Sequence, residues 1–373
     1  MKRRALKRAK PDWSRIHRES SLRIYTPVLA LFSALYRGGI TLRLCAYRHG
    51  LFKVRSLPGF VVSVGNLTTG GTGKTPAVIT LGKWAVQKGY RTAILSRGFG
   101  GKHGGEVLEV SDGTQILYDS STTGDEPYLM AKAVPGAAVI ISKKRYRAGR
   151  YAHEKFGTQL FILDDGFQHI GLKRDLDLVL IDTSYPFGNC HLLPRGPLRE
   201  PVSELTRADA IVLTRFNKRA PGVKTETFLR QHFPSIPLFC ADHVPGQVVF
   251  PGTSQIQSSD GLRSTRVVAF AGIAQPKLFK ETLENAGAHV VRFRKFSDHY
   301  SYTPGDIEAL IRMKEETGAS YILTTEKDWI RIAGIGCMPS DMAYLTVSFS
   351  FLSGYEEIFK MIGEGVETGR KDI

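Results

Sequence analysis

A glycine-rich segment that ends in Lys and Thr is the part of the sequence best suited to chemistry. Residues 63–76 read SVGNLTTGGTGKTP and follow an apolar run that begins at Gly59. A loop of this kind between a strand and a helix wraps nucleotide phosphates with its backbone N–H groups. Thr68 stands where the usual pattern has its first glycine, but Gly70 and Gly71 can supply the tight turn. The alternative is a glycine turn followed by Lys74 and Thr75 by chance.

The nucleotide interpretation predicts ATP and Mg²⁺ as cofactors. Lys74 would reach the β- and γ-phosphates, and the Thr75 hydroxyl would ligate the metal. The residues predicted to contact the nucleotide are consecutive: Thr68, Thr69, Gly70, Gly71, Thr72, Gly73, Lys74 and Thr75.

Two adjacent carboxylates form a second candidate site. Residues 160–169 read LFILDDGFQH, so that Asp164 and Asp165 end a buried-looking strand. Carboxylates at this end of a strand face the phosphate loop in an open α/β sheet and are hard ligands that suit Mg²⁺. The alternative is an Asp-Gly turn after a strand. Gln168 and His169 are predicted to contact substrate, although His169 could instead brace Asp165.

An acid and a histidine elsewhere in the chain could assist the transfer of a phosphoryl group. Asp125 lies before an apolar helix, where it is either an N-cap or the base that accepts a hydroxyl proton. His299 follows the strand expected at 290–293 and could orient that base when a cleft closes, or could be structural.

Basic loops at 96–102, 143–147 and 193–201 could clamp phosphate or could be solvated surface. Residues 324–328, TTEKD, read as a helix start capped by Thr325, and physical chemistry alone requires no function there.

The elements that must position these residues alternate between strands and helices. Strands are expected at 60–64, 92–95, 137–141, 160–163, 178–181 and 210–213, and helices from residue 74 and at 146–156. A second set has strands at 267–270, 290–293, 321–323 and 345–348 and helices at 277–286 and 307–314. Between the sets, prolines at 234, 237, 245 and 251 break the pattern.

This alternation predicts an α/β fold of the P-loop NTPase type, with a mostly parallel sheet and helices on both faces. The expected organisation is a basic extension and interfacial membrane helix at 1–55, a nucleotide-binding domain at 56–215, a smaller α/β domain closing over the cleft at 216–350, and a C-terminal helix and tail at 351–373.

The charge of the chain is concentrated at its beginning. Residues 1–55 hold 14 Lys and Arg residues against two acids, and therefore +12 of the total formal charge of +16. Within them, residues 24–36 are apolar but shorter than the roughly 20 residues that span a bilayer. An apolar stretch with aromatics between arginines favours a helix lying in the interface of an anionic membrane surface; a core helix with a solvated basic face is the alternative. Nucleic-acid binding is not expected, because stacking aromatics and a basic helix-turn-helix are absent. Four scattered cysteines indicate a reducing compartment and no zinc site.

Taken together, seven motifs in one order resemble the tetraacyldisaccharide 4'-kinase family of lipid A biosynthesis. They are GNL at 65–67 with GKTP at 73–76, SRG at 96–98, GDEP at 124–127, LDDGFQH at 163–169, LLP at 192–194 with LREP at 198–201, DH at 298–299 and TTEKD at 324–328.

This resemblance implies ATP- and Mg²⁺-dependent phosphorylation of the 4'-hydroxyl of a tetraacyldisaccharide 1-phosphate, which gives the bis-phosphorylated lipid. It implies that Asp125 is the base, assisted by His299. It places Thr75, Asp165 and Glu200 near the metal, beside the Asp164 carboxylate that the strand end already predicts as a metal ligand. Phosphates are implied near Arg97, Arg145 and Arg199, with Arg145 and Lys74 among the catalytic residues; Arg147 could replace Arg145 in the same loop.

The resemblance also implies a glycolipid substrate and a peripheral, monotopic position on the cytoplasmic face of the bacterial inner membrane, with no obligate protein partner expected. The alternative is a membrane-associated P-loop ATPase of the partitioning type. Such proteins have a lysine immediately before the glycine pair of the loop, and this chain has Thr69 there.

Overall fold

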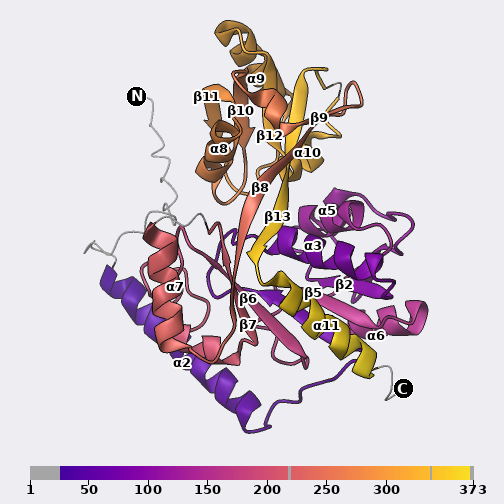
Figure 1. Ribbon diagram of the computed structural model, residues 1–373, viewed down its shortest axis with the longest axis vertical. Helices are drawn as coiled ribbons and strands as arrows, with labels where there is room; N and C mark the ends of the chain where they lie inside the picture. Colours follow the sequence, from indigo (N-terminus) through magenta and orange to yellow (C-terminus); the bar gives the residue numbers. More distant parts are fainter. Residues whose placement is uncertain (1–25, 217–219, 337, 370–373) are drawn as a thin grey trace, which may run out of the picture.

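The structure is a computed structural model and describes residues 26–216, 220–336 and 338–369. The basic extension Met1–Ser21 lies outside these residues. Figure 1 shows two lobes: the chain builds the larger one first, then the smaller upper one, and returns to the larger lobe with its last helix.

One sheet runs through both lobes in the described part of the chain. Its strand order is β11, β10, β12, β13, β8, β7, β6, β1, β5, β2, β4 and β3, with β9 paired to β8. Neighbouring strands are parallel except for the pairs β13 with β8, β3 with β4, and β8 with β9. The predicted α/β fold with a mostly parallel sheet is confirmed.

The larger lobe contains strands β1 (Phe60–Gly65), β2 (Thr92–Ser96), β3 (Leu108–Ser111), β4 (Ala138–Ile141), β5 (Leu160–Asp164), β6 (Leu176–Asp182) and β7 (Ala210–Thr214). Its helices are α2 (Thr26–Arg48), α3 (Lys74–Gln87), α4 (Ser120–Thr123), α5 (Asp125–Ala133), α6 (Arg145–Phe156), the 3₁₀ turn η1 (Val202–Arg207), α7 (Ala220–His232) and α11 (Tyr355–Gly369).

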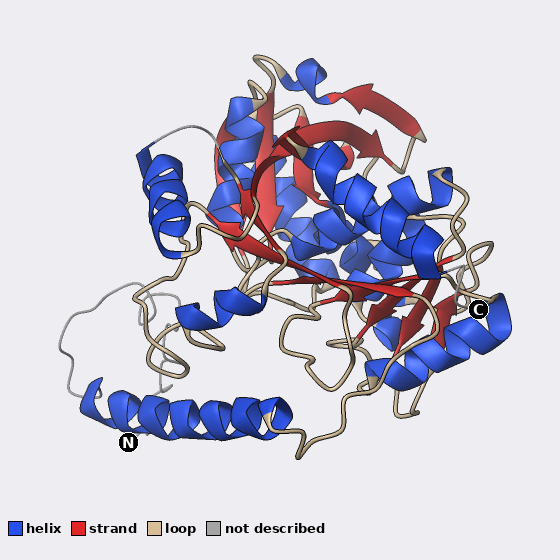
Figure 2. Ribbon diagram, turned by 60° about the horizontal axis from the view of Figure 1, so that its bottom comes forward, coloured by secondary structure: helices blue, strands red, loops and turns tan. Residues whose placement is uncertain are grey.

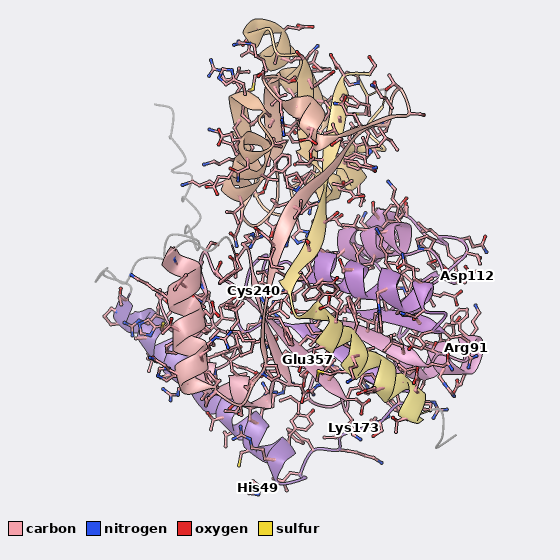
Figure 3. All side chains as sticks on the ribbon, in the orientation of Figure 1. His49, Arg91, Asp112, Lys173, Cys240 and Glu357 are labelled. Carbon is pink, nitrogen blue, oxygen red and sulfur yellow. The ribbon has the colours of Figure 1, made fainter. Side chains whose placement is uncertain are left out.

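The smaller lobe contains β9 (Gln255–Ser258), β10 (Arg266–Ala271), β11 (His289–Lys295), β12 (Tyr321–Thr325), the 3₁₀ turn η2 (Ser259–Leu262), α8 (Pro276–Asn285), α9 (Pro304–Thr317) and α10 (Glu326–Ile332). Two long strands, β8 (Leu238–Phe250) and β13 (Met342–Ser353), connect the lobes. Figure 3 labels Cys240 near the start of β8, where this strand leaves the larger lobe.

Alternation along the central strands explains why helices cover both faces of the sheet. In β1, Val62 and Val64 join the core beneath α3, while Val61 joins the opposite core beneath α6. In β10, Val267 packs toward α8 and Val268 toward α9. Each such side chain contributes roughly 1.5–3 kcal/mol when fully buried, so neither face can be left bare.

The proline-rich segment after residue 215 is more regular than the sequence indicates. It forms helix α7 and the 13-residue strand β8 instead of a simple break in the pattern. Pro245 is tolerated because it faces Val347 where the pairing register with β13 shifts, which is a place where a missing N–H costs little. The two predicted sets of strands are therefore parts of one sheet.

Helix α2 is longer than the apolar stretch that predicts it. It has 23 residues, continues through Arg37 and Arg43, and by length and composition alone could cross a membrane. Only 11% of its most apolar window is buried, so it is not a core helix. Leu31, Leu35 and Leu42 are 61%, 64% and 73% exposed. Figure 2 shows the helix lying along one side of the larger lobe.

Candidate active site

The phosphate loop has the predicted strand-to-helix context, between β1 and α3. Gly70 and Gly73 have φ angles of 122° and 90°, which only glycine adopts readily. A Cβ on Gly73 would lie 2.5 Å from the ring of His243 on β8. This glycine therefore also permits the phosphate loop to approach β8 closely. Lys74 Nζ donates to Asn66 Oδ1 at 3.2 Å, which directs the ammonium back along the loop.

Thr68 replaces glycine because the loop is held here by a neighbouring segment. Thr68 forms a β-bridge with Leu198, and the Thr69 N–H donates to Pro197 O at 2.8 Å. Arg199 N–H in turn donates to Leu67 O at 2.7 Å. The basic loop at 193–201 is therefore part of the phosphate loop's support, which its sequence alone does not reveal.

The two predicted metal carboxylates lie at the end of β5 in opposite electrostatic settings. Ser96 Oγ donates to Asp164 Oδ2 at 2.9 Å, and burial beside Glu126 and Asp165 raises the pKa of Asp164 to about 6. Burial also acts on Asp165, but Lys74 and Arg199 outweigh it and lower the pKa of Asp165 to about 2. Such crowding of negative charge is what a divalent cation would relieve.

Asp165 is held by cations and not by His169. Arg199 Nη1 donates to Asp165 Oδ2 at 2.7 Å, and Lys74 Nζ lies 3.5 Å from Asp165 Oδ1. The Asp-Gly turn is also present, because Asp165 has a φ of 53°. Burial and the charges of neighbouring arginines lower the pKa of His169 to about 4, so this imidazole is neutral near pH 7.

Gln168 links three parts of the site. Its Nε2 donates to Asn66 O at 2.9 Å, its Oε1 accepts from Arg199 Nη1 at 3.3 Å, and its backbone oxygen accepts from Arg43 Nη2 of helix α2 at 2.7 Å. Tyr36 of the same helix donates its hydroxyl to Arg199 O at 3.0 Å. Helix α2 therefore braces the loops that carry Asp165 and Arg199.

The other predicted arginines differ in their surroundings. Arg145 is buried and donates to Asp164 O at 3.3 Å and to Ser142 O at 3.2 Å; burial lowers the pKa of its guanidinium. Arg147, the alternative in the same loop, pairs instead with Glu106. Arg97 is exposed, and its charge contributes to the lowered pKa of both Arg145 and His169.

Glu200 is buried, and its Oε2 pairs with Arg207. Its Oε1 has no hydrogen-bond partner within the described residues. Across residues 26–216, 220–336 and 338–369, no three His, Cys, Asp or Glu side chains are grouped closely enough to form a metal site on their own. The three predicted carboxylate ligands, Asp164, Asp165 and Glu200, therefore do not form one cluster.

Asp125 and His299, 174 residues apart in sequence, meet between the lobes. Asp125 is the first residue of α5, its N-cap is Gly124, and its Oδ2 lies 3.3 Å from His299 Nδ1. Burial opposes ionisation of Asp125, but the contact with His299 and the Arg331 guanidinium outweigh it and hold the pKa of Asp125 below its usual range. His299 has a φ of 55°, in the left-handed region that non-glycine residues adopt at a cost in free energy.

Glu126 connects this pair with the phosphate loop. It accepts from Lys327 Nζ of the smaller lobe at 2.8 Å. Burial opposes its ionisation, but the charges of Lys327, Lys74 and His299 outweigh burial and lower the pKa of Glu126. The charges of the phosphate loop and of the Asp125–His299 pair therefore act on one carboxylate.

Sequence reasoning misses the residues of the smaller lobe that complete this region. Lys327 and Arg331 lie on α10, and Gln275 Nε2 donates to Asp182 Oδ2 at 3.3 Å next to the phosphate loop. The sequence feature that could have indicated these residues is the TTEKD segment. Its Thr325 does cap α10, because its hydroxyl accepts from the Asp328 N–H at 3.0 Å. A helix start explains the Thr and Asp of that segment but leaves Lys327 without a role.

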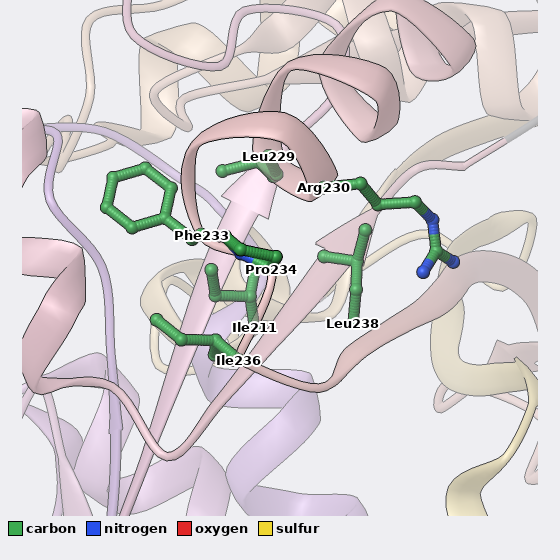
Figure 4. A pocket seen from close by; sticks show the side chains of 7 residues that line it. All are labelled: Ile211, Leu229, Arg230, Phe233, Pro234, Ile236 and Leu238. Carbon is green, nitrogen blue, oxygen red and sulfur yellow. The ribbon is translucent and has the colours of Figure 1, made fainter.

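A pocket lies elsewhere, beneath the end of α7 (Figure 4). It is largely apolar, with Arg230 at its edge, and is lined by Ile211, Leu229, Arg230, Phe233, Pro234, Ile236 and Leu238. None of the predicted site residues lines it.

Comparisons with known proteins agree with the motifs. Residues 25–363 match the model of the tetraacyldisaccharide-1-P 4'-kinase family. The tetraacyldisaccharide 4'-kinase of Syntrophus aciditrophicus is 42% identical over 332 residues, covering 86% of this chain and 88% of that protein. The enzyme of the same name from Desulfotalea psychrophila is 43% identical over 304 residues, covering 80% and 86%. The crystal structure of LpxK from Aquifex aeolicus in complex with ATP superposes with a TM-score of 0.74 at 35% identity, covering 91% of this chain and 99% of that one.

Proposed function

The chain belongs to the tetraacyldisaccharide-1-P 4'-kinase family, and from this premise we propose that the site between its lobes transfers the γ-phosphate of ATP to the 4'-hydroxyl of a tetraacyldisaccharide 1-phosphate. It is an ATP-dependent kinase of lipid A biosynthesis, and its acceptor substrate is a glycolipid. The observation that carries the proposed site is the meeting of Asp125 with His299 across the lobes, beside Glu126, which Lys327 of the smaller lobe holds at 2.8 Å.

In this proposal Asp125 accepts the proton of the attacking hydroxyl. Its Oδ2 is occupied by His299 and Arg331, whereas no donor among the described residues reaches Oδ1, which leaves that oxygen for the substrate. A depressed pKa keeps the carboxylate ionised at neutral pH. His299 orients the carboxylate, so that most of the rate comes from alignment of the hydroxyl.

Lys74 and the loop from Thr68 to Thr75 hold the phosphates in this proposal, and Arg145 adds charge near the transferring group. The donors proposed for Mg²⁺ are the carboxylates of Asp164 and Asp165 and the Thr75 hydroxyl, which are oxygen ligands of the kind that Mg²⁺ prefers. Glu200, whose Oε1 has no hydrogen-bond partner among the described residues, is not grouped with these carboxylates. Bound Mg²⁺ would neutralise charge that develops on the phosphates.

Arg97, Gln168, His169 and Arg199 are the proposed contacts to the glycolipid. Arg97 is exposed and free to pair with a lipid phosphate, while the neutral His169 can exchange hydrogen bonds with a sugar hydroxyl. Arg199 holds Asp165, and Gln168 holds the phosphate loop through Asn66 O. In this proposal both residues lie between the bound glycolipid and the bound nucleotide.

The exposed apolar side chains of α2 and the family to which the chain belongs support association with a membrane. In our proposal α2 lies in the anionic cytoplasmic surface of the inner membrane as a peripheral anchor, without a nucleic acid or an obligate protein partner. Residues 56–215 then bind the nucleotide and residues 216–350 close over the site. Each basic residue near such a surface contributes roughly 1 kcal/mol.

The proposal is tested by incubating the full-length protein in detergent with labelled ATP, Mg²⁺ and the tetraacyldisaccharide 1-phosphate, and separating the lipids. Formation of a labelled bis-phosphorylated lipid is the expected result. Hydrolysis of ATP without any labelled lipid would contradict the proposal and favour the partitioning type of ATPase.

Helix α2 is expected to act on turnover as well as on membrane binding. A Tyr36→Phe and Arg43→Met double variant removes the donors to Arg199 O and Gln168 O. At about 1 kcal/mol for each hydrogen bond, the two losses together amount to about 2 kcal/mol, so turnover of detergent-dispersed lipid should fall about 30-fold. The matched control is Leu31→Ser with Leu35→Ser on the exposed face, which should lower recovery with membranes and leave turnover in detergent unchanged. Equal turnover of the two double variants in detergent would refute the brace.

A further inference from the structure

Arg331 lies at the centre of the contact between the lobes. Its Nε–H donates to Asp125 Oδ2 at 2.6 Å, and its Nη2 lies 3.3 Å from His299 Nδ1. Since the same Nδ1 is 3.3 Å from Asp125 Oδ2, the three side chains close a triangle. Its corners come from the start of α5, the loop after β11 and the helix α10.

The guanidinium is fixed from behind by buried acceptors. Arg331 Nη1 donates to Asp328 Oδ1 at 2.9 Å and to Gly272 O at 2.7 Å. Asp328 also accepts from the Tyr302 hydroxyl at 2.9 Å and from the Gly272 N–H at 3.0 Å. The side chains of Arg331 and Asp328 are 8% and 0% exposed. A planar guanidinium held in this way presents its remaining N–H groups in one direction.

Hydrogen-bond chemistry limits what this triangle can do. A guanidinium only donates, so the Arg331 N–H occupies Asp125 Oδ2 in every protonation state of His299. His299 Nδ1 can either donate to Asp125 or accept from Arg331, but it cannot do both. Arg331 therefore bonds Asp125 in both cases, and it bonds His299 as well when Nδ1 is the acceptor.

We propose that Arg331 is a positioning residue for phosphoryl transfer, which holds the Asp125 carboxylate and the His299 imidazole in register as the lobes meet. The inference rests on the proposed role of Asp125 as the base. The charged groups that face Asp125 are His299, Arg331 and Lys327, and Arg331 is the one that contacts both members of the pair. Buried Asp328 is the anchor through which the smaller lobe sets the position of this cation.

The test uses the full-length protein in detergent micelles with labelled ATP, Mg²⁺ and the lipid acceptor. Arg331→Met should lower kcat about 100-fold with the KM for ATP changed less than about threefold, because small misplacements of reacting groups carry costs of that size. Arg331→Lys should be intermediate, because it keeps the charge without the fork of donors. The control Arg294→Met breaks an ion pair of the smaller lobe, with Asp306 at 3.1 Å, and should leave kcat unchanged.

Two further readouts separate positioning from simple support of the fold. Removal of the guanidinium should move the acidic limb of the kcat profile to higher pH, since Asp125 loses a cation that favours its ionised form. In an Asp125→Asn background, adding Arg331→Met should lower kcat by less than about a further threefold, because the two residues act as a unit. Two outcomes would overturn the inference. One is an unchanged acidic limb of the kcat profile together with a raised KM, and the other is a further loss of kcat of about 100-fold in the Asp125→Asn background.

A crystal structure of the Arg331→Met protein tests the contact without any assay. Separation of Asp125 Oδ2 from His299 Nδ1 beyond hydrogen-bond distance would support the inference, and an unchanged pair would refute it. Failure of the unmutated protein to label the lipid would instead refute the proposed function.

Discussion

Replacement of Lys74 with methionine is expected to reduce kcat/KM for ATP by about 10³-fold, the largest effect we expect from any change in the phosphate loop. The ammonium lies 3.2 Å from Asn66 Oδ1 and 3.5 Å from Asp165 Oδ1, and its side chain is only 14% exposed. Methionine keeps much of the length and volume but removes the charge that would meet the β- and γ-phosphates. The change is measured as initial rates of lipid labelling, together with ATP binding by calorimetry.

The matched control for this prediction is Lys83→Met. Lys83 lies on the same helix, α3, but is exposed and outside the loop. Its replacement should leave both ATP binding and kcat/KM unchanged within about twofold, as is usual for surface substitutions. A Lys74→Met protein that keeps more than a tenth of the original kcat/KM would show that the loop does not hold the phosphates as we propose.

Most of the repeating α/β pattern follows from sequence because it depends on local chemistry. The strands around β1, β5 and β10 are apolar runs bounded by turns, and their predicted bounds differ from the observed ones by a residue or two. The same is true of α3, which begins at Lys74 directly after a glycine with positive φ. Local propensity and the tertiary environment agree at these positions.

Strand β8 could not be predicted in this way. The prolines in and around it indicate irregular structure, and its pairing with β7, β9 and β13, the last about 100 residues later in the chain, makes the extended conformation favourable. Helix α2 extends beyond its apolar stretch, since Arg37 and Arg43 lie in one continuous helix. Arg43 is accommodated because it reaches the backbone of Gln168, a contact that no local pattern contains.

In the candidate site, too, the residues in local motifs could be predicted from the sequence, and those that depend on long-range contacts could not. Lys74, Asp164 and Asp165 lie in recognisable local motifs, and the structure brings Lys74 and Asp165 close together, as the strand order of an α/β sheet requires. The role of Arg331 depends on a contact across 206 residues, and its own segment reads only as a capped helix start. Glu200 shows the limit of a motif, because its partner in the structure is Arg207 and its metal role stays a prediction.

Substitution of Asp125 by asparagine is expected to lower kcat by about 10³- to 10⁴-fold while the KM for ATP changes little. Asparagine keeps the shape and can still accept from Arg331, but it cannot take a proton from the substrate hydroxyl. Because the pKa of Asp125 is held below its usual range, the unmutated enzyme should lose activity through this group only as pH falls through that lowered pKa. The group should therefore stay ionised and active across neutral pH.

Rates of lipid labelling as a function of pH measure this prediction, and Asp112→Asn is its control. Asp112 is a partly buried aspartate of the same lobe, labelled in Figure 3, whose carboxylate bonds only to its own turn at Thr114 and Gln115 among the described residues. Its replacement should leave kcat and the pH profile unaltered. If Asp125→Asn retains more than about a tenth of the original kcat, the proton is accepted elsewhere, and the meeting of Asp125 with His299 and Arg331 would serve to hold the lobes together and not to carry the chemistry.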